Sequence, residues 1–183
     1  MAADLSSLVP EFKVKVEQVL LNCELRGIQM RPFETLRSPF KQARLWRQSR
    51  SGEEIRQKIA ELKSGDASFL AFCIESVGPQ SGIPVTKAIP GLSWHQWGEA
   101  VDCFWLVQGK ASWDTKLKVN GINGYAVYAE ESENLGLDSG YFWKKFRDVP
   151  HVQFRNQSSP LQIYTLPQID RIMRERFGES SPV

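Results

Sequence analysis

His95 and His151 are the two histidines of the chain, and each lies close to an aspartate in the sequence. His95 precedes Asp102 by seven residues, and His151 follows Asp148 by three. On one continuous α-helix, seven residues rise by about 10 Å, which is too far for two side chains to bind one ion. If His95 lies on a turn and Gly98 permits a sharp reversal into a strand, His95 and Asp102 can converge on one point. The first pair therefore predicts a metal site.

The second pair, Asp148 and His151, also lies outside a regular helix. Pro150 lacks a backbone donor and disfavours helical geometry at Val149. A carboxylate at the end of a loop and a histidine at the start of a strand can place one group on a metal and the other on its bound water. Two histidines and one carboxylate with an open fourth position form a recurrent catalytic zinc site. We therefore expect zinc chemistry.

Helical patterns surround these motifs. Apolar residues at helical spacing predict helices over residues 10–26, 39–50, 122–134 and 167–177. Ser51 and Glu54 have the spacing of a capping box, which predicts a further helix that ends at Gly65. Asp66 is placed to cap the next helix, whose apolar residues pack inward before the loop that begins at Gly78.

Strand patterns occupy the centre and the late part of the chain. They are predicted at Val85–Ala88, Ala100–Val107 and His151–Arg155. Residues 28–36 are also extended, and Pro32 favours an edge position there. Because the helices come first and most strands later, we expect an α+β fold. A small antiparallel sheet would carry the zinc site and be flanked by helices.

The composition fits a single globular domain. The chain has 183 residues, of which 42% are hydrophobic and 24% charged. We therefore expect one domain over residues 1–183, with an ordered core from near residue 8 to near residue 178. No apolar run approaches the roughly 18 residues that cross a bilayer, and the N-terminus lacks the pattern of a signal peptide. We expect synthesis in the cytoplasm and no membrane insertion.

Charge and cysteine content exclude further classes. The net charge of +2 gives no reason to expect nucleic-acid binding, although a basic run from Arg37 to Arg50 keeps that alternative in view. The three cysteines are odd in number, far apart and without a CxxC pair. We expect reduced, buried thiols rather than disulfides or a zinc ribbon.

The motifs resemble those of the zinc D,D-carboxypeptidase, D,D-dipeptidase and L-alanyl-D-glutamate endopeptidase family, which acts on peptidoglycan stem peptides and includes many phage endolysins. The central family motif, Ser-x-His followed by Gly-x-Ala-x-Asp, is matched by Ser93, His95, Gly98, Ala100 and Asp102. The late motif, Asp or Glu-x-x-His, is matched by Asp148 and His151, and an upstream arginine and glutamine by Arg37 and Gln42. The stretch LGLDSGYFWKKFRDVPH looks like the endolysin branch.

The resemblance implies a role for each matched residue. His95, Asp102 and His151 would ligate one zinc ion per chain, and water would take the fourth place. Because zinc lowers the pKa of such water from about 15.7 towards about 7, a weak base nearby suffices to activate it. Asp148 would be that base and would later pass the proton to the leaving amine.

Arg37 would stabilise the tetrahedral oxyanion, and Ser93 and Gln42 would contact the substrate. Each assignment has a structural alternative. Asp148 could cap a turn or form a salt bridge, Arg37 could lie on a solvated basic face, and Ser93 could be an ordinary loop hydroxyl. For the aromatic residues near the motif, core packing is favoured over stacking on glycan: Trp94, Trp97 and Trp105.

Taken as a whole, the resemblance implies a bacteriolytic zinc metallopeptidase that hydrolyses an amide bond of the peptidoglycan stem in the bacterial cell wall. An endolysin-like L-alanyl-D-glutamate endopeptidase is the leading interpretation, and we expect a monomer. Two alternatives stay open: a D-alanyl-D-alanine carboxypeptidase or dipeptidase, and a non-enzymatic wall-binding or virion structural module in which zinc only stabilises the fold.

Overall fold

The computed structural model describes residues 3–179. The chain divides into two compact units, each built from two segments. The sheet unit combines Met1–Leu36 with Trp97–Asn156, and the helical unit combines Arg37–Gln96 with Gln157–Val183. The expectation of one domain over residues 1–183 stays a prediction. Within the described part of the chain, no helix is long and apolar enough to cross a membrane.

The sheet unit holds all the strands of the described residues. Its helical elements are η1 (Leu5–Ser7), α1 (Pro10–Leu25) and α5 (Gly124–Asn134). Its strands are β1 (Gln29–Glu34), β2 (Ala100–Val107), β3 (Lys110–Ser112), β4 (Asp138–Ser139) and β5 (His151–Gln153). The pairings are antiparallel, in the order β1-β2-β5-β4, with β3 also beside β2. This arrangement confirms the predicted small antiparallel sheet and the edge position of Pro32.

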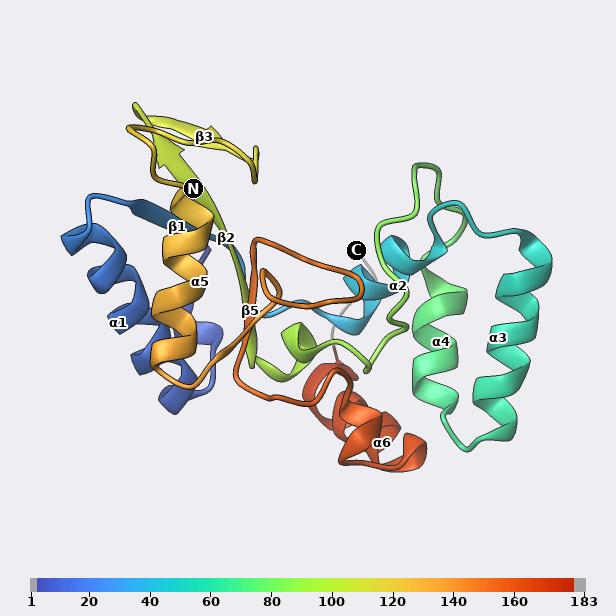
Figure 1. The fold of residues 1–183 in the computed structure, drawn as a ribbon. Coiled ribbons are helices and arrows are strands. Elements are labelled where there is room, and N and C mark those ends of the chain that lie inside the picture. The colour runs from blue at the N-terminus through green and yellow to red at the C-terminus, as the bar shows by residue number, and fades with distance from the viewer. Residues whose placement is uncertain (1–2, 180–183) are drawn as a thin grey trace. The chain divides into compact units, whose positions relative to one another are not determined.

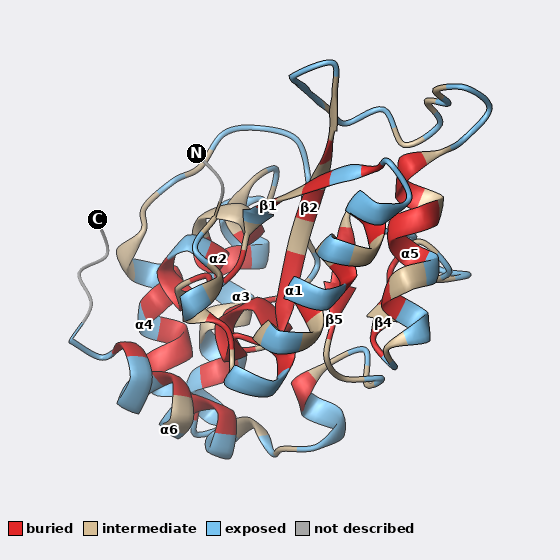
Figure 2. Ribbon diagram, turned by 90° about the vertical axis from the view of Figure 1, so that its left-hand side faces the viewer, coloured by how far each residue is buried: buried red, intermediate tan, exposed pale blue. Residues whose placement is uncertain are grey.

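Strand β2 has one face in the hydrophobic core of this unit and one face that carries Asp102. Val101, Cys103 and Trp105 are buried in the core that α1 and α5 complete. Helices α1 and α5 lie side by side, and β2 runs past them (Figure 1). Figure 2 shows the buried residues along β2 and on one side of α5, with exposed residues on the other side of that helix. Since side chains alternate along a strand, Asp102 and Phe104 lie on the opposite face.

The helical unit consists of helices joined by short turns and by the long loop that follows α4. Its elements are α2 (Pro39–Arg47), α3 (Gly52–Ser64), α4 (Ser68–Ser76), η3 (Pro160–Gln162) and α6 (Leu166–Phe177), and η2 (Trp94–Trp97) leads into the sheet unit. The predicted capping box is present. The Ser51 hydroxyl accepts from the backbone amide of Glu54, and the Glu54 carboxylate accepts from the backbone amide of Ser51. Helices α3 and α4 run side by side (Figure 1).

Two sequence predictions about this unit are wrong. Asp66 does not cap α4: it has a positive φ of 56°, and Ala67 is the cap residue without a side-chain bond. The buried carboxylate of Asp170, on α6, instead accepts from the Leu70 amide at 2.9 Å. Residues Val85–Ala88 form no strand.

Cysteines follow the prediction. All three are free and buried, and burial raises the pKa of each thiol to about 12. Cys103 lies on the core face of β2, opposite the face that carries Asp102, as expected for a residue excluded from metal binding.

The contact between α5 and β2 gives a test of this packing. A Cβ atom on Gly124 would lie 2.5 Å from two ring atoms of Trp105. We therefore expect Gly124→Ala to reduce the free energy of unfolding by about 1–3 kcal/mol, because a buried ring must move. Denaturant unfolding measures the loss. Gly52→Ala is the matched control, because its only close neighbour is the flexible end of Arg56; an equal loss in both variants would contradict the proposed packing.

Candidate metal centre

Asp102 and His151 are brought together by strand register. They are directly opposite partners in the antiparallel pairing of β2 with β5, so both side chains point to the same face. Asp102 Oδ1 lies 2.9 Å from His151 Nδ1, and the two side chains are 19% and 10% exposed. The pairing thus places a carboxylate against an imidazole in a largely water-excluded setting.

His95 lies on a turn rather than in an α-helix, as the sequence predicts. The 3-10 helix η2 begins where the Gln96 amide donates to the Ser93 carbonyl at 3.0 Å. Gly98 then reverses the chain with a φ of +71°, and a Cβ there would lie 2.9 Å from the Ser7 carbonyl oxygen. Strand β2 follows with the predicted bounds, Ala100–Val107. His95 itself is 2% exposed.

These three residues could hold a metal ion. One ligand atom from each of His95, Asp102 and His151 lies within 4.8 Å of the others. Zinc bonds of about 2.0–2.2 Å place tetrahedral ligand atoms about 3.4 Å apart. Two imidazoles and one carboxylate, all largely buried, match the donors that zinc prefers while leaving a fourth position for water. The residues present therefore fit a catalytic zinc ion.

The electrostatics of His151 reflect its partners. Burial alone would lower its pKa, but the hydrogen bond and charge of Asp102, together with the charge of Asp148, outweigh burial and raise it. His151 Nδ1 and Asp102 Oδ1 lie within hydrogen-bond distance of each other, at 2.9 Å. A metal ion binds an imidazole nitrogen only where that nitrogen carries no proton.

Asp148 is exposed and lies at the end of a loop whose two ends are joined by backbone hydrogen bonds. Its amide donates to the Gly140 carbonyl at 3.1 Å, and its own carbonyl accepts from the His151 amide at 3.1 Å. The Gly140 amide donates to the His151 carbonyl at 2.9 Å. A Cβ on Gly140 would lie 2.2 Å from the Asp148 carbonyl oxygen, so only glycine permits this closure. The loop thus fixes the backbone of Asp148 relative to β5.

Arg37 and Gln42, which the resemblance pairs, are in contact in the helical unit. Arg37 is 9% exposed, so it does not belong to a solvated basic face. Its guanidinium donates to Gln42 Oε1 at 2.8 Å, and Gln96 donates to the same oxygen at 3.0 Å. The Gln42 amide donates in turn to the Ala88 carbonyl at 2.7 Å. A buried amide network therefore orients the guanidinium.

The two residues predicted to contact substrate are placed differently. Gln42 is fully buried and supports Arg37, and a direct substrate contact by it stays a prediction. Ser93 is half-buried at the start of η2, two residues before His95. The neighbouring tryptophans are buried, at 3% for Trp94, 7% for Trp97 and 3% for Trp105, in accord with core packing.

Sequence reasoning missed a set of polar residues beside His151. Gln153 Oε1 lies 3.3 Å from His151 Nε2, and Gln153 Nε2 donates to Asp138 at 3.0 Å. Trp143 donates to the other oxygen of Asp138 at 2.8 Å. The available signal was the strand itself, because residues two apart on β5 face the same side.

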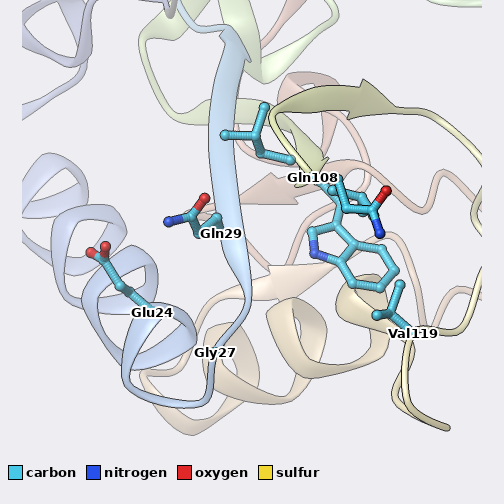
Figure 3. A pocket seen from close by; sticks show the side chains of 8 residues that line it. Glu24, Gly27, Gln29, Gln108 and Val119 are labelled. Atoms are coloured by element: carbon cyan, nitrogen blue, oxygen red, sulfur yellow. The ribbon is translucent and has the colours of Figure 1, made fainter.

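A surface hollow of about 280 Å³ lies elsewhere on the sheet unit, lined in part by Glu24, Gln29 and Gln108 (Figure 3). None of the predicted site residues lines it. It contains neither histidine, and it offers no set of metal ligands.

A family model described as VanY, D-alanyl-D-alanine carboxypeptidase, matches residues 5–145. The chain belongs to the VanY family. The match includes Arg37, His95 and Asp102 but ends before Asp148 and His151. Asp148 and His151 are therefore placed only by the structure of β5 and the loop before it.

Two similar proteins complete the comparison. The peptidoglycan L-alanyl-D-glutamate endopeptidase CwlK of Bacillus subtilis (strain 168) is 32% identical over 77 residues, which are 40% of this chain and 46% of that protein. The match thus spans less than half of that relative. The L-Ala D-Glu endopeptidase ChiX of Serratia marcescens aligns with a TM-score of 0.43 and 19% identity, over 82% of this chain and 83% of that one.

Metal content tests the ligand set. We expect the protein purified without chelator to hold approximately one zinc ion per chain, and His151→Ala to lose most of it, because two ligands bind far more weakly than three. Elemental analysis gives the ratio. Asp114→Asn is the matched control, since this exposed aspartate only caps the turn at Lys116. Unchanged zinc in His151→Ala would remove His151 from the ligand set.

Proposed function

We propose that the protein is a zinc-dependent peptidase that hydrolyses an amide bond of peptidoglycan stem peptides at the bacterial cell wall. The observation that carries this proposal is the convergence of His95, Asp102 and His151 within 4.8 Å in a chain of the VanY family. One bound zinc ion per chain would act as a Lewis acid that polarises the amide carbonyl and lowers the pKa of a water molecule.

The bond between L-alanine and D-glutamate is the proposed target. The similarity to CwlK, which is named for this specificity, supports it. The description of the family model favours a second candidate, removal of the terminal D-alanine. The two activities differ in the termini they create, so one digestion separates them.

Asp148 is the proposed general base. Its exposed carboxylate lies on a backbone-closed loop, and its charge acts on His151. A carboxylate held there can accept the proton of the attacking water and return it to the leaving amine. Arg37 is the proposed oxyanion donor, because a planar guanidinium that Gln42 orients can offer two parallel N–H groups to developing negative charge.

Digestion of purified sacculi tests the function, and Asp148→Asn tests the base. The zinc-loaded parent should release new L-alanine carboxyl termini and D-glutamate amines, identified by mass spectrometry. Asp148→Asn should lower the rate about 10²-fold to 10⁴-fold, because an amide cannot accept the proton. Its zinc content and melting temperature should stay near those of the parent, since the side chain is exposed and is not a ligand.

Each outcome of this experiment is informative. Released D-alanine would move the assignment to the carboxypeptidase. Zinc binding without any hydrolysis by the parent would favour a wall-binding module. A variant as active as the parent would remove Asp148 from the mechanism, whereas lost zinc would make it a ligand.

Arg37→Lys tests the oxyanion donor separately. Lysine keeps the positive charge but loses the planar pair of donors, so we expect turnover to fall about 10²-fold to 10³-fold. Zinc content should be unchanged. Lys41→Arg, on the exposed surface of α2, is the control for altered basic residues. Turnover within a few fold of the parent would show that the guanidinium makes no special contact in the transition state.

A further inference from the structure

His151 is the first member of a hydrogen-bonded row that crosses two strands. Its Nδ1 faces Asp102 at 2.9 Å, and its Nε2 faces Gln153 Oε1 at 3.3 Å. The amide of Gln153 then reaches Asp138, its direct partner in the pairing of β4 with β5. Gln153 is 2% exposed, so water does not replace these partners.

The orientation of the Gln153 amide is fixed by what surrounds its nitrogen. Gln153 Nε2 donates to Asp138 Oδ2 at 3.0 Å and to the Arg155 carbonyl at 2.5 Å. Both partners are acceptors, so a reversed amide would set an oxygen against two oxygens. The carbonyl end must therefore face His151.

Asp138 is itself held in place by an aromatic residue. Trp143 Nε1 donates to Asp138 Oδ1 at 2.8 Å, and the Trp143 ring lies 5.4 Å from that of His151, measured between centroids. The carboxylate thus has one oxygen for the tryptophan and one for the glutamine. The imidazole, the indole and the carboxylate form one packed group.

An amide oxygen accepts hydrogen bonds and cannot donate them. Facing Gln153 Oε1, His151 Nε2 must carry a proton, and a neutral ring then has its lone pair on Nδ1. That nitrogen is the one beside Asp102.

We propose that Gln153 and Asp138 are positioning residues that hold His151 in the Nε2–H tautomer, so that Nδ1 is presented to the metal ion. This inference rests on the proposed zinc site and names the residues that prepare it. Polar partners on the far nitrogen of a metal-binding histidine fix the ring orientation and the tautomer, and their loss weakens metal binding about 10-fold to 100-fold.

Asp138→Asn is the decisive variant because asparagine has nearly the same shape as aspartate but can place a hydrogen-bond donor where Asp138 has an acceptor. The new amide can donate to Gln153 Oε1, which favours a turn of the Gln153 nitrogen towards His151 and leaves the Arg155 carbonyl to oppose that turn. Nε2 would then become an acceptor, and the proton would move to Nδ1. We expect the dissociation constant for Zn²⁺, measured by chelator competition, to rise about 10-fold to 100-fold.

A nitrogen-15 spectrum of the zinc-loaded protein reads the tautomer directly. Since the chain has two histidines, few imidazole signals need assignment. The parent should show a slowly exchanging proton on Nε2 of His151, and in zinc-loaded Asp138→Asn this proton should exchange faster, because Gln153 Oε1 no longer accepts it. Trp143→Phe keeps a ring beside His151 and removes one bond to Asp138, so it should shift both readouts in the same direction by less.

Asp114→Asn is the matched control, and thermal unfolding of the metal-free variants checks their folding. Zinc affinity of Asp138→Asn within about 3-fold of the parent, together with an Nε2 proton that exchanges as slowly as in the parent, would overturn the proposal, as would a parent proton on Nδ1. If the parent binds zinc through Nδ1 but leaves sacculi intact, the proposed function fails while this inference stands.

Discussion

The antiparallel register of β2 and β5 is the constraint on which the site depends. It sets Asp102 opposite His151, and because the period of a strand is two residues, it also places Gln153 on the same face. A slip of one residue would turn these groups into the core and bring Val152 outward. The core residues on the other face, among them Val101 and Cys103, resist such a slip because it would expose them. Hydrophobic burial on one side of the sheet thus fixes the chemistry on the other.

Local patterns predict most helices and the main strand, and they fail where an element is too short to show a period or where a residue distant in sequence determines the local structure. Strand β2 shows clear alternation and was predicted with its bounds, whereas β4 has two residues and no period to detect. Val85 favours a strand by composition, yet the nearby backbone bonds to side chains, with the Ala88 carbonyl accepting from Gln42. Asp66 has the type of a capping residue, but a carboxylate from α6, distant in sequence, takes that role. The support of His151 was missed because it joins β4 to β5, which no local pattern connects.

Carboxamides recur beside the charged groups of this protein. Gln42 accepts from Arg37, and Gln153 Oε1 faces His151 Nε2 at 3.3 Å, each amide with its nitrogen fixed by oxygen acceptors elsewhere. A carboxylate in either place would add negative charge and compete for the cation. An amide oxygen orients the neighbouring side chain without adding charge. The same physical device thus appears once in each unit.

In the loop between Gly140 and Asp148, the residues that hold the ends together differ from the residues exposed to solvent. Its ends are tied by backbone hydrogen bonds, which do not depend on side-chain identity apart from the glycine. Between them, residues 144–147 are all exposed. This segment can therefore change in composition and even in length while the register of β5 and the positions of Asp102 and His151 are kept. Substitutions in this segment of the loop, which joins β4 to β5, carry little thermodynamic cost, whereas a substitution in β5 changes the residues paired with β2.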